Sequence, residues 1–392
     1  MTEHKTDSAA TASAQVLAAE QTPPEALAEF YRQTWNAKAS AEAVTRALRA
    51  SAAGNAVRPG QAPTAVTFVL ADRVIGYLGS IPAWFWDGSG EHTADWLKGF
   101  MVLPEHRNGP VGHMLLRDMT KRVSVAGSLV VAEPARRLMQ ALGYRGLGAL
   151  SNRVLVLRYG RLATRISPDR LGLPRFVHPW FGVIRAAQKI GLAYIAGAVA
   201  GAGVRMWHAV RRLRLRKYEI AVGGAHATDE EIDTLWNRVR VGLASASVRN
   251  ARYLRWRYPD GPNDAYTFIF VRDAGQLEAI AVIRRPSTSW EDRLAGVKLA
   301  TLSDIVFRTD NVEAGLAALA AARRVALRFG ADALLGSASH PVLERALKES
   351  GYVGLGGTLH FHLRIPEGKH SFSTDIRDWW LTRGDGSSDG GV

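Results

Sequence analysis

Residues 96–119 decide the fold of this chain and read Trp-Leu-Lys-Gly-Phe-Met-Val-Leu-Pro-Glu-His-Arg-Asn-Gly-Pro-Val-Gly-His-Met-Leu-Leu-Arg-Asp-Met. The apolar residues 96–103 predict a strand, and the proline- and glycine-bearing residues 104–110 predict a turn. Apolar side chains then recur at helical spacing, at Val111, Met114, Leu115 and Met119. The stretch is therefore interpreted as a strand, a tight turn and a helix.

The point where this strand gives way to the helix is suited to an anion. Arg107, Gly109 and Gly112 lie there. A helix N-terminus offers unpaired backbone N–H groups and the positive end of the helix dipole, which favour a group such as a pyrophosphate. Glycines let a phosphate approach the backbone closely. The stretch therefore predicts a phosphate-binding loop.

This loop resembles motif A of the GNAT acyltransferase superfamily, in which a strand ending Val-x-Pro precedes Arg/Gln-x-x-Gly-x-Gly/Ala and the loop backbone holds the pyrophosphate of acyl-coenzyme A. Val102, Pro104, Arg107 and Gly112 match that motif. Pro110 stands where its first glycine is expected and has no N–H to donate, so Gly109 is the nearest replacement. The resemblance implies acyl-coenzyme A, such as acetyl-coenzyme A, as cosubstrate. The residues expected to hold it are Phe100, Met101, Val102, Arg107, Asn108, Gly109, Val111, Gly112 and His113.

The order of predicted elements resembles the same superfamily. Residues 22–160 predict two helices, three strands, a helix, a strand, a helix and a strand, which is the GNAT order. Residues 218–366 repeat a similar order, so we interpret the chain as a diverged internal duplication. The second copy lacks the phosphate loop, and its Asp310 and Glu313 would repel a pyrophosphate. The expected fold is α/β, with an N-terminal acyl-coenzyme A-binding lobe and a degenerate C-terminal lobe, each a mixed, mostly antiparallel sheet flanked by helices.

Composition narrows the class of protein further. A chain of 392 residues, of which 47% are hydrophobic, suits two domains with real cores. The absence of cysteine excludes disulfides, thiolate metal sites and a cysteine nucleophile. Residues 1–21 are polar and lack the layout of a signal peptide, so we expect a flexible leader and a cytoplasmic protein. Residues 367–392 are expected to form a tail.

The net charge of +14 suits an anionic partner, either nucleic acid, anionic lipid or coenzyme A. The sequence carries no recognisable nucleic-acid-binding motif, so nucleic acid is not an expected partner. Residues 161–217 predict a basic, apolar helical linker, and its uncharged stretch 190–204 is shorter than the roughly 20 residues of a membrane span. A true membrane span is one interpretation of this linker, and two others stay open. The linker either packs on a lobe or lies on an anionic membrane surface, which would place the protein at the periphery of the inner membrane.

Acyl transfer from a thioester needs a polarised carbonyl and a base for the incoming amine or hydroxyl. The resemblance implies that backbone N–H groups around residues 100–102 polarise the carbonyl. In the family a carboxylate often lies on this strand. Trp96 falls at that place, and its neighbour Asp95 faces the other side unless a bulge turns it. Glu91 and His92, in the preceding loop, are the alternative bases.

The leaving thiolate needs an acid, which in the family is usually a tyrosine on the last helix of the lobe. Met139 takes that place here, and Tyr144 lies nearby as either the acid or a core residue. No metal is expected, because no defensible metal-ligand geometry emerges for the candidate histidines His340, His360 and His362.

We therefore expect an acyltransferase that moves an acyl group, such as acetyl, from acyl-coenzyme A to an amine or hydroxyl of a sugar precursor or related metabolite. The acceptor class rests on residues 253–258 and 378–385, which resemble those of tandem-GNAT proteins associated with bacterial surface-polysaccharide synthesis. The alternative is a catalytically degenerate binding or scaffold protein at a membrane-associated polysaccharide machine. Pro110, Met139 and the missing strand carboxylate favour that alternative.

Overall fold

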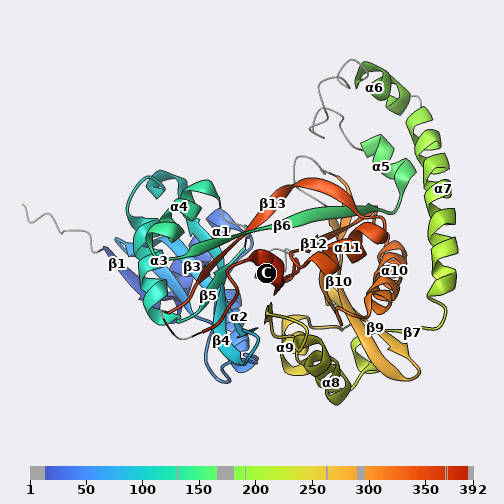
Figure 1. The fold of residues 1–392 in the computed structure, drawn as a ribbon. Coiled ribbons are helices and arrows are strands. Elements are labelled where there is room, and N and C mark those ends of the chain that lie inside the picture. The colour runs from blue at the N-terminus through green and yellow to red at the C-terminus, as the bar shows by residue number, and fades with distance from the viewer. Residues whose placement is uncertain are drawn as a thin grey trace, which may run out of the picture. The chain divides into compact units, whose positions relative to one another are not determined.

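The computed structural model describes residues 14–129, 132–165, 181–189, 191–261, 264–288, 296–366, 368 and 370–386. The first thirteen residues, the proline-bearing stretch 166–180 and the last six residues of the predicted tail lie outside these ranges. The described residues form two compact units, whose elements Figure 1 labels. The first unit draws on Met1–Pro82, Thr93–Arg145 and Leu363–Glu367, and the second on Ala83–His92, Gly146–His362 and Gly368–Val392.

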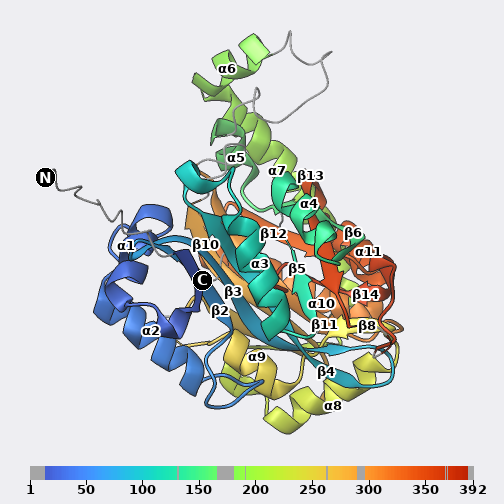
Figure 2. The same cartoon turned by 90° about the vertical axis from the view of Figure 1, so that its left-hand side faces the viewer.

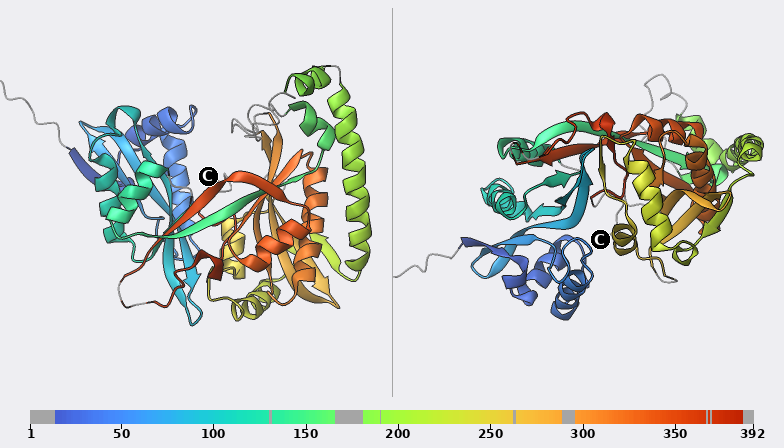
Figure 3. Two further views of the ribbon diagram at one scale, coloured as in Figure 1. Left: turned by 45° about the horizontal axis from the view of Figure 1, so that its top comes forward. Right: turned by 60° about the horizontal axis from the view of Figure 1, so that its bottom comes forward.

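The first unit is a sheet between two pairs of helices. Its strands follow the order β1-β2-β3-β4-β5, in which β1 and β3 run antiparallel to β2 and β4 runs parallel to β5. Helices α1 and α2 lie on one face of the sheet, and α3 and α4 lie on the other (Figure 3). The elements are β1 (Ala14–Ala18), α1 (Pro24–Thr34), α2 (Ala41–Ala53), β2 (Ala65–Leu70), β3 (Arg73–Trp86), β4 (Glu91–Val102), α3 (Val111–Arg122), β5 (Ala126–Ser128) and α4 (Glu133–Ala141).

Neighbouring residues of β3 show how this sheet holds helices on both faces. Gly76 faces α3, which lies across the strands in Figure 2, and a Cβ there would come within 2.9 Å of Val111 and 2.8 Å of Leu115. Tyr77 faces the other side, where its ring centroid lies 6.5 Å from that of Phe30 on α1. Side chains alternate along a strand, so the glycine leaves room for a closely packed helix on one face, while the aromatic ring contacts a helix on the other.

The second unit is built around a longer sheet with the strand order β13-β6-β12-β11-β10-β9-β7. Strand β8 pairs with β14 and with the tip of the β3–β4 hairpin, where Phe85 is opposite Ser247. The elements are β6 (Arg145–Val156), β7 (Glu219–Val222), α8 (Asp229–Arg240), β8 (Ser245–Ser247), α9 (Ala251–Arg257), β9 (Tyr266–Asp273), β10 (Gln276–Thr288), β11 (Lys298–Phe307), α10 (Val312–Arg328), β12 (Ala333–Ala338), α11 (Pro341–Glu349), β13 (Val353–Arg364) and β14 (Trp379–Trp380).

The two halves of the chain repeat one succession of elements. The order β2-β3-β4-α3-β5-α4 is matched by β9-β10-β11-α10-β12-α11, and in each half the middle helix joins two parallel strands. After each final helix, a glycine with positive φ precedes a buried tyrosine, with φ of 83° at Gly143 and 85° at Gly351. The closing strand of the first half, β6, pairs antiparallel with β12 of the second unit. The lobe boundaries at residues 160 and 218 stay predictions.

Two predicted segments have more structure than expected. Residues 14–18, assigned to the flexible leader, form β1 and pair with residues 66–70 of β2. The linker contains α5 (Tyr159–Arg165), α6 (Phe181–Lys189) and α7 (Leu192–Arg214). Small residues bring α7 against α5, since a Cβ on Gly197 or Gly201 would come within 2.8 or 3.2 Å of Tyr159. Within the described ranges, no helix combines the length and apolar character needed to cross a bilayer.

Candidate functional site

The N-terminus of α3 presents a row of backbone donors that have no partner among the described residues. The first hydrogen bond within the helix runs from the N–H of Met114 to the carbonyl of Pro110, at 3.0 Å. The N–H groups of Val111, Gly112 and His113 precede that bond, and the N-cap residue Pro110 supplies no side chain to cap them. Proline is well suited to this position because its missing N–H would be unpaired anyway. The proline therefore leaves the three donors at the helix terminus in place.

Gly109, the nearest replacement for the missing motif glycine, uses its N–H within its own turn. Its N–H donates to the carbonyl of His106 at 3.2 Å, as part of the turn that follows the short 3-10 helix Pro104–His106. Arg107 folds back toward β4, where its Nε donates to the carbonyl of Val102 at 3.0 Å while the residue stays exposed. A positive side chain and three N–H groups thus lie at the same end of the helix.

Among the residues that the structure describes, the pairing of β4 with β5 ends before this loop. Within the described residues, β4 and β5 pair at Asp95 and Trp96, and β5 ends at Ser128. Gly99 then adopts a φ of +63°, a conformation that glycine reaches without steric cost. The backbone of residues 100–102 follows this break, and the ring of Phe100 lies 3.4 Å from where a Cβ on Gly112 would stand. The geometry gives a strand edge that opens toward the start of α3.

The N-terminus of the matching helix in the second half is capped and acidic. Asn311 caps α10, since its side-chain oxygen accepts from the N–H of Ala314. Asp310 and Glu313 lie at this terminus, and Arg308 is engaged by Asp310. A Cβ on Gly315 would come within 2.7 Å of the ring of Phe307, so the ring of Phe307 packs closely against this helix turn. Of the two helix termini, the one on α3 suits an anion.

Asp95 lies on β4, and its carboxylate is fully buried and engaged. Arg58 donates to both of its oxygens, with Nη1 3.0 Å from Oδ1 and Nη2 2.6 Å from Oδ2. The hydroxyl of Ser80 donates to Oδ1 at 2.8 Å. Burial raises the pKa of the Asp95 carboxyl, and Arg58 and Ser80 oppose that shift. This arrangement holds the carboxylate in place and keeps it from solvent.

Glu91 and His92, the alternative bases, lie in the second unit and not with Asp95. Glu91 accepts from Arg240 at 2.9 Å and from the indole N–H of Trp236 at 3.3 Å. His92 lies 2.8 Å from Asp87, measured from Nε2 to Oδ2. Each of these side chains is thus held by a partner within its own unit.

Tyr144 and Met139 belong to the hydrophobic core of the first unit. The hydroxyl of Tyr144 is buried without a hydrogen-bond partner among the described residues, and burial raises its pKa above the ordinary value. Tyr352, at the matching place in the second half, is buried in the same way. Because the second half, whose matching helix terminus is capped and acidic, keeps the same tyrosine, the position favours a packing role.

The sequence did not reveal the two polar side chains that hold the Asp95 carboxylate. Arg58 lies in an irregular segment between α2 and β2, and Ser80 lies within β3, and neither belongs to a recognisable motif. Asp304, a charged residue among apolar neighbours in the sequence of β11, is buried and paired with Arg249, 55 positions away in sequence. A lone charged residue in a strand was the signal in that case, but it did not identify the partner.

Comparison with known proteins identifies the fold. No protein-family model matches the sequence, and no curated protein is significantly similar to it. N-myristoyltransferase of Saccharomyces cerevisiae, solved with bound myristoyl-CoA, matches 94% of this chain and 89% of its own with a TM-score of 0.57 and 11% identity. A probable N-acyltransferase from Enterococcus faecalis V583 matches 92% of this chain and 74% of its own, with a TM-score of 0.52 and 10% identity. A GCN5-related N-acetyltransferase from Kribbella flavida matches 91% and 71%, with a TM-score of 0.50 and 14% identity.

These matches confirm the predicted fold class. The chain has the α/β fold of the GNAT N-acyltransferases, and it resembles the tandem-GNAT N-myristoyltransferase over most of its length. At 10–14% identity, such a likeness establishes the fold and not the activity. The catalytic and cofactor-binding residues, and the link to surface-polysaccharide synthesis, stay predictions.

Proposed function

We propose that this protein is an acyl-coenzyme A-dependent acyltransferase that binds its cosubstrate at the N-terminus of α3. The observation that carries the proposal is the row of N–H groups on Val111, Gly112 and His113, next to the open end of β4. Backbone donors and the helix dipole together stabilise an anion at such a terminus. The matching terminus of α10 is capped and bordered by acidic side chains, which supports placing the cosubstrate in the first unit.

The residues around this terminus would have two roles, which are to anchor the cosubstrate and to activate its thioester. The three N–H groups would hold the pyrophosphate, and Arg107 would add a positive charge beside it. The backbone of residues 100–102, past the break at Gly99, would lie along the pantetheine arm and donate an N–H to the thioester carbonyl. A donor aimed at developing negative charge lowers the barrier to acyl transfer.

The proposed acceptor is an amine or hydroxyl of a sugar precursor or related metabolite, and the proposed acyl group is acetyl. The acceptor class is supported by the resemblance of residues 253–258 and 378–385 to tandem-GNAT proteins of polysaccharide synthesis. We assign no base, because Asp95 and Glu91 are each engaged by cationic partners. Holding the acceptor against the thioester contributes to the rate even without a base.

Because Asp95 and Glu91 are both engaged by arginines, a second candidate function is acyl-coenzyme A binding without turnover. Asp95 is buried beneath Arg58 and Ser80, and Tyr144 and Met139 are core residues. A protein with these features could serve as a scaffold that responds to acyl-coenzyme A. Binding and turnover must therefore be measured separately.

Calorimetric titration with acetyl-coenzyme A tests the anchoring step. We expect micromolar binding with one site per chain. Arg107→Glu is expected to weaken binding at least about tenfold, or ~1.4 kcal/mol, because it replaces a positive charge beside the pyrophosphate with a negative one. The matched control is Arg117→Glu, the same change of charge at an exposed position further along α3.

The two candidate functions differ in the step after binding. Release of free coenzyme A thiol in the presence of a panel of amino sugars and sugar alcohols supports the acyltransferase. Tight binding without thiol release supports the binding protein. Equal affinities of the wild type, Arg107→Glu and Arg117→Glu for acetyl-coenzyme A would contradict the proposed site, and absence of binding at millimolar concentration would contradict both functions.

We also propose that α7 rests on an anionic membrane surface. Its small residues face α5, while large apolar side chains on another face are exposed, including Val199 at 68% and Met206 at 71%. Leu192, Ile195, Val199, Met206 and Leu213 are all exposed and fall within one narrow stripe at 100° per residue. The sequence contains no acidic residue from Arg170 to Tyr218. An apolar stripe flanked by basic residues suits the interface of an anionic bilayer.

Sedimentation with liposomes tests this second proposal. We expect the protein to sediment with vesicles that contain phosphatidylglycerol and not with pure phosphatidylcholine. Val199→Glu is expected to reduce sedimentation several-fold, since it places a charge in the stripe. Val241→Glu is the matched control, because Val241 is 84% exposed at the end of α8, in a different part of the chain. Equal loss in both variants, or no loss in either, would contradict the role of α7.

A further inference from the structure

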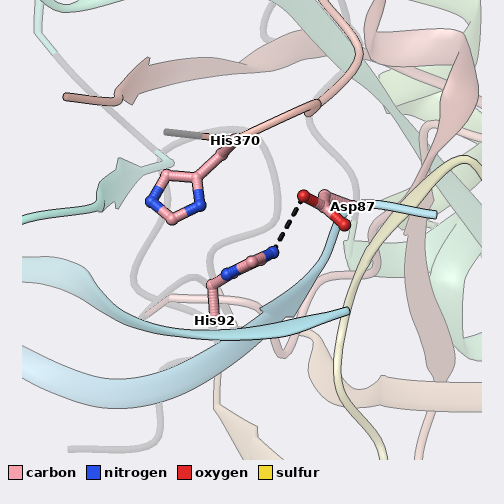
Figure 4. A group of neighbouring side chains, drawn as sticks. All are labelled: Asp87, His92 and His370. Carbon is pink, nitrogen blue, oxygen red and sulfur yellow. Dashed lines mark hydrogen bonds and ion pairs between the residues drawn. The ribbon is translucent and has the colours of Figure 1, made fainter. Parts of the chain in front are cut away.

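Three potential metal-binding side chains meet at the tip of the β3–β4 hairpin. Asp87 follows β3, His92 lies near the start of β4, and His370 lies in the segment that follows β13. Their donor atoms all lie within 4.8 Å of one another, and Figure 4 shows the two imidazole rings and the carboxylate facing a common centre. All three residues belong to the second unit, and none of them belongs to the proposed acyl-coenzyme A site.

The carboxylate of Asp87 is held in a fixed orientation. Its Oδ1 accepts from the N–H and hydroxyl of Ser89 and from the N–H of Gly90, at 3.0, 2.7 and 2.9 Å. Its Oδ2 faces the histidines and accepts from the N–H of Ser371 at 3.2 Å. Burial would raise the pKa of Asp87, but the hydrogen bonds outweigh it and hold the pKa well below its usual range. The hydrogen bonds thus orient one oxygen of Asp87 toward the cluster.

The histidines are positioned by aromatic packing. The rings of His92 and His370 lie 4.3 Å apart in an edge-to-face arrangement. Phe372 packs beside both, with ring centroids 5.6 Å from His92 and 5.4 Å from His370, and it stacks in turn on Trp379. Asp87 is buried while both histidines are partly exposed, so the cluster has a protein wall on one side and access to solvent on the other.

From this geometry we propose that Asp87, His92 and His370 form a binding site for a zinc ion, with a fourth position open to water. Two imidazoles and one carboxylate are a donor set that zinc prefers, whereas calcium and magnesium prefer oxygen ligands alone. Ligand atoms of one tetrahedral zinc ion lie about 3.3 Å apart. Small side-chain rotations that move the donor atoms by roughly an ångström would therefore bring the three to the spacing that zinc requires. The hydrogen bonds to Oδ1 of Asp87 supply the outer support that such sites need.

The site would fasten a distant part of the chain to the hairpin. Ser371 and Asp87 are 284 positions apart in sequence, and the ion would join one ligand from the segment after β13 to two ligands on the hairpin. A bound metal stabilises the folded state in proportion to its affinity and concentration. No local motif indicates the site, because the two histidines are far apart and neither has a ligand at a recognisable metal-binding spacing.

The test uses the full chain, without a histidine tag and stripped of metal with a chelator. We expect calorimetry with zinc chloride to give one ion per chain with submicromolar affinity, and cobalt(II) to give the visible absorption of a tetrahedral site. His92→Ala and His370→Ala are each expected to weaken zinc binding by more than about 100-fold. His226→Ala is the matched control, because His226 is exposed elsewhere in the second unit.

Asp87→Asn is a further variant that retains the side-chain shape and the acceptor for Ser89. Its circular dichroism in the presence of chelator should match that of the wild type, while its affinity for zinc falls. Zinc binding that is the same in the wild type and in the three cluster variants would mark an adventitious surface ion and overturn the proposal. Absence of binding by the folded wild type at 100-fold excess over the expected dissociation constant would also overturn it.

Discussion

Arg58 and Asp95 form a two-pronged ion pair, in which the two terminal nitrogens of the guanidinium lie 3.0 and 2.6 Å from the two carboxylate oxygens. Asp95 is fully buried and Arg58 is about a quarter exposed. The pair joins β4 to the irregular segment between α2 and β2, at the last part of β4 that still pairs with β5. The carboxylate raises the pKa of Arg58, so the arginine stays charged. The pair therefore supports the strand from which the proposed site opens.

Loss of Arg58 should destabilise the first unit strongly. Arg58→Met leaves a buried carboxylate with Ser80 as its remaining donor, and the removal of one partner of a buried pair costs about 3 kcal/mol. Urea unfolding followed by circular dichroism measures this change. Arg122→Met is the control, because Arg122 and Asp118 form a partly exposed pair on α3 that is worth no more than about 0.5 kcal/mol. Similar losses in the two variants would contradict a structural role for the buried pair.

Asp95→Asn separates a structural role of Asp95 from a catalytic one. The amide retains the shape and one acceptor, so binding of acetyl-coenzyme A should stay within about twofold. If Asp95 acts by positioning β4, turnover should fall in proportion to the loss of stability and should recover at lower temperature. Loss of turnover by more than about 100-fold in a fully folded variant would make Asp95 the base instead.

Removal of the hydroxyl of Tyr144 should leave the protein intact. Tyr144→Phe removes a buried hydroxyl without a hydrogen-bond partner among the described residues, so the free energy of unfolding should change by no more than about 0.5 kcal/mol. Tyr352→Phe is the matched control in the second half, where the buried hydroxyl is also unsatisfied. We expect unchanged turnover in both. A tenfold loss of turnover confined to Tyr144→Phe would identify this tyrosine as the acid.

Substitution of Arg249 should strongly destabilise the second unit. Its guanidinium is fully buried and pairs with Asp304 and Asp385, each at 2.8 Å. Arg249→Met would leave both carboxylates buried without their cation, at a cost of about 4 kcal/mol. Arg345→Met is the control, because Arg345 is 73% exposed and its pair with Glu349 contributes less than about 0.5 kcal/mol. Thermal unfolding measures the midpoint temperature of both variants. An unchanged midpoint for Arg249→Met would contradict a stabilising role for the buried cation.

Glu231 should make the stability of the second unit depend on pH. It accepts from the N–H of Thr228 at 2.8 Å and pairs with Arg272 at 2.7 Å, and these contacts lower its pKa. Because the folded pKa lies below the unfolded value of about 4.3, the stabilisation is complete above that pH and is lost as the pH falls below it. Glu231→Gln should therefore cost about 0.5 kcal/mol at pH 7 and progressively less below pH ~4.

Unfolding in urea at a series of pH values measures this effect. Glu230→Gln is the control, since it removes a carboxylate from the same first turn of α8 and reports on the helix dipole alone. A cost of Glu231→Gln that stays constant from pH 7 to pH 3, or one equal to that of Glu230→Gln throughout, would contradict the assigned ion pair.

Much of the fold is encoded in local patterns. The strand, turn and helix of residues 96–119 were predicted because hydrophobic spacing and the positions of glycine and proline act within a few residues. The duplication was visible because the same order of elements recurs. The prediction erred where tertiary contacts outweigh local composition. Residues 14–18 lie in a stretch polar enough to suggest a leader, yet they form a strand because β2 offers them a free edge.

By itself, the sequence determined the α/β class, the doubled order of elements and the position of a helix start suited to an anion, since each depends on neighbouring residues. The tertiary structure decided which polar groups are free and which are engaged. It joined Arg58 to Asp95 across 37 positions, and Asp87 to the segment after β13 across 284. It also showed that Gly109 uses its N–H within the turn. These hydrogen-bond and ion-pair partners depend on which strand edges and loops come together in the folded chain. Residues that are close in sequence do not determine that arrangement.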